Sequence, residues 1–215
     1  ADLAIFVVSA VEGVEVQTEI AWRLAEARGL PRAIFVNKLD RERASFERTL
    51  EQLKERFGAG VAPLELPIGE EAAFRGVVDL LSDEAITYSD NRATGVTGAV
   101  PPEMEMKEHA VHDALIEGIV VADDALTERY LNDEKIEIHE LEHALATGIA
   151  EASVFPVLCG SATKLVGVDR LAHFIAEEGP APDVGDGSPA VFVFKTIVDP
   201  YVGRVNLFKV LQGTV

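Results

Sequence analysis

Three short runs of consecutive apolar residues place the strongest constraint on the fold of this chain. They cover residues 3–8, 33–36 and 155–159. Strands of a parallel sheet are buried on both faces, so they read as continuous apolar runs, and each needs a long, usually helical, connection to the next. Between the first two runs, apolar residues recur at helical spacing and predict a helix over residues 17–28. The pattern therefore predicts an α/β fold, with a parallel sheet covered by helices.

This alternation of strand and helix is interrupted once. We assign residues 1–58 to the first part of an α/β domain and residues 153–179 to its last strand and helix. The residues between them, 59–152, change in pattern and predict an inserted α+β subdomain. Its candidate strands lie near residues 64–67, 77–80 and 85–88, and its candidate acidic helices near residues 103–118 and 137–149.

Residues 180–189 are rich in Gly, Pro and Asp, which favour turns and extended backbone over helix or strand. We interpret them as a linker. Beyond them, residues 190–196 and 205–210 flank a turn-prone segment and predict the first strands of an antiparallel β domain over residues 190–215. Both ends of the chain fall within strand-like runs, so we expect it to be a piece of a longer protein.

The composition narrows the class of protein. Of the 215 residues, 48% are hydrophobic and 26% are charged, which is enough apolar material for a core and argues against disorder. No apolar run reaches the roughly 20 residues of a membrane span. The single cysteine, Cys159, cannot form an internal disulfide, and no secretory signal opens the chain. We therefore expect a cytoplasmic protein without a membrane partner.

The formal net charge of −18 is distributed unevenly along the chain. Residues 103–151 hold 14 acidic and 3 basic side chains, whereas residues 1–57 are close to neutral. Such an acidic surface repels a phosphate backbone. It indicates either a solvated helical face that keeps the chain soluble or a face that binds another protein.

The sequence Asn-Lys-Leu-Asp at Asn37–Asp40 directly follows the second apolar run. A carboxylate at Asp40 can accept two hydrogen bonds from the N1–H and the 2-amino group of guanine, which adenine does not offer. Adenine in the same pocket would leave a buried carboxylate unpaired, at a cost of about 1–3 kcal/mol or more. Taken alone, these four residues are also typical of a polar turn at the end of a strand.

A loop of small residues, Gly160–Ala162, follows the third apolar run. Its backbone N–H groups can come close to a base oxygen because no large side chain stands in the way. The carboxyl ends of neighbouring parallel strands meet at one edge of a sheet, where α/β proteins bind their ligands. We therefore expect this loop and Asn37–Asp40 to form a ligand crevice together.

These motifs resemble those of the translational GTPases, most closely elongation factor G or an elongation factor G-like paralogue. Asn37–Asp40 is similar to the guanine-specificity motif of the family, and Gly160–Ala162 to its last guanine-contacting loop. The other similar segments are residues 1–19, 66–69, 76–80, 194–196 and 199–204. The resemblance implies a partial P-loop-type G domain with an inserted α+β subdomain, followed by the first strands of a β-barrel domain II.

The resemblance also implies a site for GTP or GDP. In the family, the residue matching Asp40 binds guanine N1 and N2, and those matching Asn37 and Lys38 surround the base and ribose. The loop residues near guanine O6 match Ser161 and Ala162, and a lysine often stacks near the base at the position of Lys164. The predicted nucleotide-binding residues are therefore Asn37, Lys38, Asp40, Ser161, Ala162 and Lys164.

Other parts of the family's catalytic apparatus are not in this sequence. It contains no G-x-x-x-x-G-K-[ST] phosphate loop, no D-x-x-G switch and no first-switch threonine. We expect the Mg²⁺ ligands to belong to the parent protein, and we expect this chain not to hydrolyse GTP alone. The resemblance implies further sheet strands before residue 1, so we also expect an exposed sheet edge that supports a dimer or a domain swap.

Two functions follow from the resemblance. The first is a GTP-binding factor whose parent hydrolyses GTP on the ribosome, in translocation or a related step. The sequence leaves open whether the parent is the housekeeping factor or a paralogue. The alternative is a non-catalytic protein-binding module that contacts the ribosomal stalk protein through the acidic residues 103–151.

Two pairs of histidines are candidate metal ligands, and the single cysteine is a candidate reactive group. His139–His143 fits the H-E-x-x-H pattern of zinc proteases, but no convincing third ligand follows, and the two histidines are predicted to face solvent. His109 and His112 are more simply two histidines on an acidic helix. Cys159 ends an apolar strand and is interpreted as a small buried residue. We predict no metal site and no catalytic residue in this chain.

Overall fold

The computed structural model describes residues 1–89, 93–120, 124–132, 134–181 and 187–214. The chain divides into two compact units, Ala1–Pro180 and Ala181–Val215, and each is described by itself. Half of the predicted linker 180–189 lies outside the described residues, because residues 182–186 are not among them.

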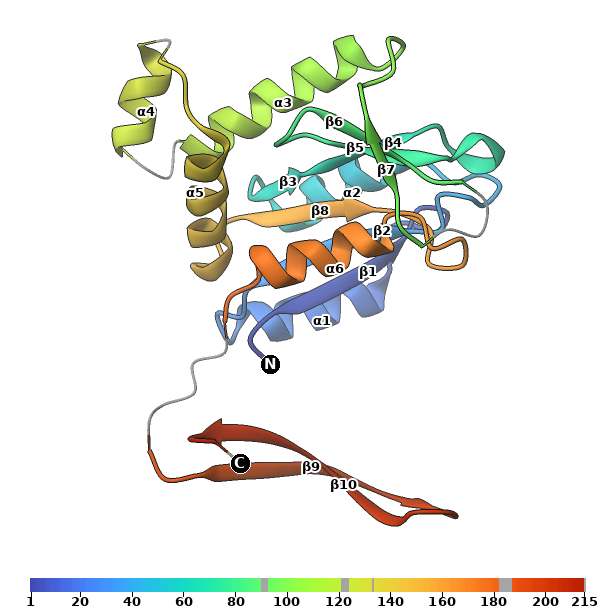
Figure 1. Cartoon of the computed structure of the whole chain (residues 1–215), viewed down its shortest axis with the longest axis vertical. Coiled ribbons are helices and arrows are strands. Elements are labelled where there is room, and N and C mark those ends of the chain that lie inside the picture. Colours follow the sequence, from blue (N-terminus) through green and yellow to red (C-terminus); the bar gives the residue numbers. More distant parts are fainter. Residues whose placement is uncertain (90–92, 121–123, 133, 182–186, 215) are drawn as a thin grey trace. The chain divides into compact units, whose positions relative to one another are not determined.

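A parallel sheet forms the centre of the first unit (Figure 1). Its strands are β1 (Ala4–Ser9), β2 (Arg32–Asn37), β8 (Phe155–Cys159) and β3 (Val61–Pro63), in the order β1-β2-β8-β3. The register pairs the last residue of β1 with the last residue of β2, and Val36 of β2 with Cys159 of β8. The carboxyl ends of these three strands therefore meet at one edge, and the predicted α/β fold class is confirmed.

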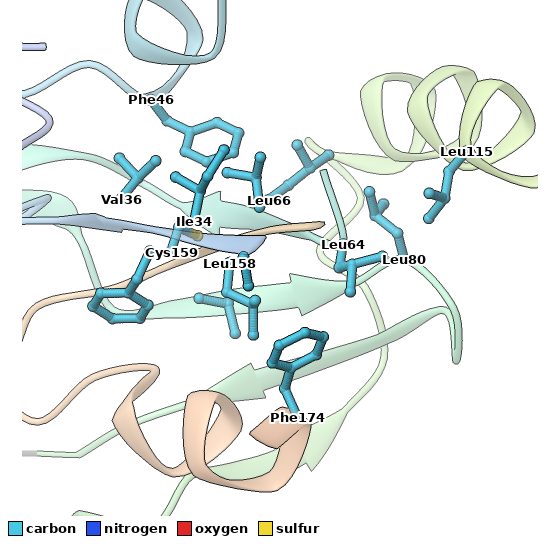
Figure 2. Close-up of a cluster of buried hydrophobic side chains, with 14 of the residues drawn as sticks. Ile34, Val36, Phe46, Leu64, Leu66, Leu80, Leu115, Leu158, Cys159 and Phe174 are labelled. Atoms are coloured by element: carbon cyan, nitrogen blue, oxygen red, sulfur yellow. The ribbon is translucent and has the colours of Figure 1, made fainter. Parts of the chain in front are cut away.

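Helices cover both faces of this sheet. On one face, α1 (Val16–Glu26) and α2 (Phe46–Phe57) meet where the Trp22 ring stacks on Phe57 with 4.0 Å between the ring centroids. On the other face lies α6 (Val168–Glu177). Figure 2 shows the result in the core, where Phe46 and Phe174 lie on opposite sides of the strands. The central strands β2 and β8 are buried on both faces, as their continuous apolar runs require, whereas β1 at the edge is only partly buried.

An antiparallel sheet lies beside β8 and forms part of the insertion. We call it the inserted sheet: β4 (Glu65–Ile68), β5 (Gly76–Asp79), β6 (Glu84–Thr87) and β7 (Val96–Gly98), in that order, with a short 3-10 helix, η1 (Glu71–Ala73), between β4 and β5. The strand β3 comes from the same stretch of sequence but pairs in parallel with β8. Part of the predicted insertion 59–152 thus belongs to the main sheet, because the backbone at Gly60 and Leu64 hydrogen-bonds to β8.

The rest of the insertion is helical, with α3 (Glu105–Val120), α4 (Asp124–Leu131) and α5 (Ile138–Ala150). The helices α3 and α5 pack together through apolar side chains that include Leu115, Ile119 and Leu145, all buried. The pattern along the sequence did not predict α4. Its eight residues are too few to show a clear helical period, and Leu126 is the one described apolar side chain in it that is buried.

The second unit is a β-hairpin of β9 (Ala190–Asp199) and β10 (Gly203–Gln212). Its turn is held by the Asp199 carboxylate, whose Oδ1 accepts the backbone N–H groups of Tyr201 and Val202 at 2.8 and 2.9 Å. Gly203 follows with φ of 82°, a left-handed conformation that favours glycine. The hairpin agrees with the two strands predicted after the linker, and it fits the start of a β domain.

Candidate functional site

Asn37 joins two loops at the carboxyl edge of the parallel sheet. It is the last residue of β2, and its side-chain Oδ1 accepts the backbone N–H of Ala162 at 2.9 Å. The same oxygen accepts the N–H of Lys38 at 2.8 Å. One amide side chain therefore fixes the start of the Asn37–Asp40 loop against the loop that follows β8. The two segments that the sequence predicted to meet are thus in direct contact at this edge of the sheet.

Lys38 has φ of 67°, and its side chain is half exposed above the sheet edge. Its Nζ lies 3.3 Å from Oε2 of Glu12, in the loop that follows β1. The Ser9 hydroxyl donates to the same Glu12 oxygen, and this hydrogen bond, together with Lys38, lowers the pKa of Glu12. Glu12 and Lys38 thus form an ion pair beside the Asn37–Asp40 loop. A concavity of about 500 Å³ lies here, lined by Val11, Glu12, Asn37, Lys38, Arg41, Glu42 and Thr163.

Asp40 carries a nearly buried carboxylate with spare hydrogen-bonding capacity. Its side chain is 7% exposed, and the nearest cation, the Arg41 guanidinium, has its Nε 3.7 Å from Oδ2. Oδ1 is buried and has no hydrogen-bond partner among the described residues. A buried carboxylate oxygen without a donor costs free energy, so this position fits a ligand that brings N–H donors.

The loop after β8 is folded tightly on itself. The N–H and C=O of Ser161 pair with the C=O and N–H of Val166, at 2.9 and 3.1 Å. The buried Ser161 hydroxyl accepts the N–H of Lys164 at 3.3 Å. Ala162 and Lys164 are left exposed at the tip. Ser161 therefore shapes the loop from inside, whereas the other two predicted residues are available to a ligand.

Gly160 allows the two loops to approach each other. Its N–H donates to Val36 O at 2.9 Å, and its C=O accepts the N–H of Leu39 at 3.3 Å. A Cβ at this position would lie 2.3 Å from the carbonyl oxygen of Val166 and 2.7 Å from the Phe35 ring. Only glycine fits between these groups.

Several side chains that support these loops were not found from the sequence. Arg48 on α2 donates through Nη2 to the carbonyl oxygens of Ala10 and Val11, at 2.9 and 3.0 Å. From the insertion, Glu71 accepts the N–H of Arg43 at 2.6 Å through Oε1, and the C=O of Leu39 accepts the Glu71 N–H at 2.7 Å. These contacts span 28 or more residues, and no local spacing signals them.

In the histidine motif on α5, the glutamate that would act as the general base is already paired with other groups. Glu140, the glutamate of H-E-x-x-H, is bound by both Nη atoms of Arg129, at 2.6 and 3.2 Å, and accepts the N–H of Glu137 at 3.0 Å. The hydrogen bond from Arg129 is the main reason that the pKa of Glu140 falls to about 2. His139 and His143 are exposed. This glutamate serves as a helix-capping and ion-pairing group.

Of the remaining candidates, His112 contacts the backbone and Cys159 is buried. The Nδ1 of His112 lies 2.6 Å from the carbonyl oxygen of Leu80, while His109 is exposed. Cys159 is fully buried, and burial raises the pKa of its thiol. In the part of the chain that the structure describes, no three His, Cys, Asp or Glu side chains are grouped to hold a metal ion. No helix within the described ranges is long and apolar enough to cross a bilayer.

Comparison with known proteins identifies the family. The model of the family described as "Elongation factor Tu GTP binding domain" matches residues 1–181. Among solved structures, a crystal structure of a protein from Thermus thermophilus is similar, with a TM-score of 0.88 and 34% sequence identity. The match covers 99% of this chain and 32% of the other, so the chain spans about a third of that relative's length. The chain belongs to the family of translation elongation GTPases and carries the elongation factor Tu-type GTP-binding domain.

Proposed function

We propose that the loops Asn37–Asp40 and Ser161–Lys164 form the guanine-recognising half of a GTP site. The observation that carries this proposal is the contact between Asn37 Oδ1 and the Ala162 N–H at 2.9 Å, which unites the two loops beside Asp40. The carboxylate of Asp40 has an oxygen without a donor among the described residues, so guanine would complete its hydrogen bonding. The family membership of the chain supports a guanine nucleotide as the ligand.

The chemistry of guanine suits this carboxylate. The N1–H and the 2-amino group both donate, and a planar carboxylate accepts both at once. Adenine has no proton on N1 and no amino group on C2, so it would leave Asp40 buried and unpaired. A site built around a buried polar group rejects a ligand that cannot pair with it.

The other residues have complementary roles in the proposal. The stem of Lys38, which is paired with Glu12, lies across one face of the base. Ala162 lies at the exposed tip of the loop near the proposed position of guanine O6, with its N–H donated to Asn37 Oδ1, and Ser161 keeps the loop in shape. Lys164 at the exposed tip covers the opposite side of the base. In this arrangement, Asn37 holds the two loops together through the two hydrogen bonds that its Oδ1 accepts.

At the level of the whole protein, we propose an elongation factor G-like factor that couples GTP hydrolysis to a step on the ribosome. The similar structure from Thermus thermophilus is about three times as long as the matched region, which leaves room for the phosphate-binding and Mg²⁺-binding parts elsewhere. Bound Mg²⁺ would neutralise charge on the phosphates in such a protein. The residues of this chain would select and orient the base.

Replacement of Asp40 by Asn tests the proposal. The amide places a donor opposite the guanine donors, so we expect GDP affinity to fall by about 10- to 100-fold. Xanthosine diphosphate has an acceptor at C2, so its affinity should rise. Competition against a fluorescent guanine nucleotide measures both, with D113N on the exposed surface of α3 as the matched control. Equal loss of affinity for both bases in D40N would make Asp40 a structural residue and refute the proposal.

A second proposed function is binding of the ribosomal stalk protein through the insertion. Its support is the excess of acidic residues over residues 103–151, several of which are exposed on α3, including Glu105, Asp113 and Glu117. If this surface binds the stalk protein, charge reversal of Glu105 and Glu117 to Lys should weaken the complex and leave guanine binding unchanged. Unaltered binding of the stalk protein by the double variant would exclude this surface.

A further inference from the structure

The two ends of the Ser161–Lys164 loop are both held by side chains or backbone of the inserted sheet. At the entry to the loop, the N–H of Cys159 donates to Oε2 of Glu65 on β4, at 3.0 Å. Glu65 is 2% exposed and lies 94 residues away in sequence. A buried carboxyl group in an apolar strand is costly, and here it accepts a hydrogen bond from the last residue of β8.

At the exit from the loop, Asp169 in the first turn of α6 is held in the same way. Its Oδ1 accepts the hydroxyl of Tyr88, just after β6, at 2.6 Å. Its Oδ2 accepts the N–H of Gly95, just before β7, at 3.0 Å. Both carboxylate oxygens are therefore committed to the inserted sheet. The two Asp169 contacts hold the first turn of α6, which follows the loop, against the segments that flank β6 and β7.

Arg170 ties the two ends together. Its guanidinium pairs with Asp79 on β5, and its Nε lies 3.8 Å from Oε1 of Glu65. Adjacent residues of α6 thus contact β5, β4 and the segments that flank β6 and β7. We call the side chains Glu65, Tyr88, Asp169 and Arg170 the loop clamp.

We infer that the loop clamp positions the Ser161–Lys164 loop for the base, with Glu65 and Tyr88 as positioning residues of the nucleotide site. This inference rests on the proposed function. Apart from its contact with Asn37, the loop is closed by the Ser161–Val166 pair and the Lys164–Ser161 hydrogen bond, at 2.9 to 3.3 Å. The apparent affinity for a ligand rises with the fraction of molecules whose loop is in the binding-competent conformation. Contacts that fix the ends of the loop therefore increase affinity without contacting the base.

The variant Y88F tests one end of the clamp in the 215-residue chain. It removes the hydroxyl that binds Asp169 and keeps the ring. The amides of Ser161, Ala162, Lys164 and Val166 all donate hydrogen bonds, so their hydrogen exchange reports loop opening. We expect about tenfold faster exchange at these amides relative to β2, and a similar fold loss of GDP affinity. The matched control is Y201F, because the Tyr201 side chain is 97% exposed.

The pair E65Q and E65M tests the other end. Gln retains a side-chain oxygen that can accept the Cys159 N–H, whereas Met has similar length and no such oxygen. We expect E65Q to retain loop protection and guanine affinity, and E65M to lose both by about tenfold. Melting temperature is measured in parallel, since a purely structural role would lower stability in E65M with no selective effect on loop exchange.

The outcomes separate this inference from the proposed function. If the unmodified chain binds GDP and Y88F and E65M change neither loop exchange nor affinity, the clamp does not position the loop. If the unmodified chain shows no preference for guanine over adenine, the proposed function fails, and faster loop exchange in Y88F still supports the clamp. Equal changes in Y88F and Y201F would overturn the inference.

Discussion

Asn37 and Glu65 both bind backbone N–H groups at the end of β8 or in the loop after it, but only Asn37 stands in a sequence pattern that signals a site. Asn37 stands in a local pattern, a polar residue directly after an apolar strand, and its Oδ1 accepts the Ala162 N–H at 2.9 Å. Glu65 was not recognised, because its partner Cys159 is 94 residues away. A glutamate between Leu64 and Leu66 in an otherwise apolar segment was the one available signal.

The buried Glu65 predicts how stability depends on pH. Burial is the main cause that raises its pKa from 4.5 to about 8. Between these two values the folded state binds more protons than the unfolded state, so the free energy of unfolding falls as pH rises. A single group contributes a slope of at most about 1.4 kcal/mol per pH unit.

Urea denaturation from pH 5 to pH 8 measures this slope. We expect the chain to lose stability toward pH 8, and the E65Q variant, which has no titrating group at this position, to show a flatter dependence. Glu140 serves as the internal contrast, because its pKa is lowered to about 2 and its contribution is lost only as pH falls below about 4.5. Identical slopes for the chain and for E65Q would show that Glu65 does not titrate in this range.

At the scale of elements, the sequence predicted the long strands and helices and the four-residue strands β4, β5 and β6, but not the three-residue strands β3 and β7. The continuous apolar run of β8 and the helical spacing in α2 are clear because each spans several residues of one pattern. Strands of three residues, such as β3 and β7, cannot show a period, and their pairing with β8 and β6 depends on tertiary contacts. The packing of the inserted sheet against the loop was therefore not predictable from the pattern.

The turn after β8 depends on a glycine in a way that mutation can measure. In G160A the added Cβ meets the Val166 carbonyl oxygen at 2.3 Å, so the backbone of the loop must move. We expect a loss of about 1–3 kcal/mol in unfolding free energy and weaker guanine binding. The control G118A lies on α3, where a Cβ meets nothing within 4 Å, and it should gain up to about 1 kcal/mol. A G160A variant as stable as the unmodified chain would contradict the close approach described above.

At the scale of the first unit, the outer edge of β1 has no partner strand among the described residues. The apolar side chains beside it are unusually exposed, with Val7 at 61%, Ile20 at 45% and Leu24 at 55%. Val7 and Leu24 border a concavity of about 580 Å³ between β1 and α1. Unpaired strand edges recruit other chains, and the prediction of a dimer or domain swap from the sequence is consistent with this surface but stays a prediction.

Sedimentation over a range of concentrations tests self-association. We expect the chain to form dimers at high concentration and the variant L24K, which places a charge in this concavity, to remain monomeric. The matched control is L131K at an exposed leucine of α4, where the side chain is 76% exposed. A monomer at every concentration, or an equal effect of both variants, would exclude this edge as the contact.

The central claim is that the loops after β2 and β8 select guanine, and an NMR titration of the chain with mononucleotides tests it most directly. Weak binding is sufficient for this measurement, since millimolar guanosine or adenosine monophosphate can be added. We predict that guanosine monophosphate shifts the amide signals of Lys38 and Ala162 and that adenosine monophosphate leaves them unchanged. Equal shifts with both nucleotides, or no shift with either, would contradict the account.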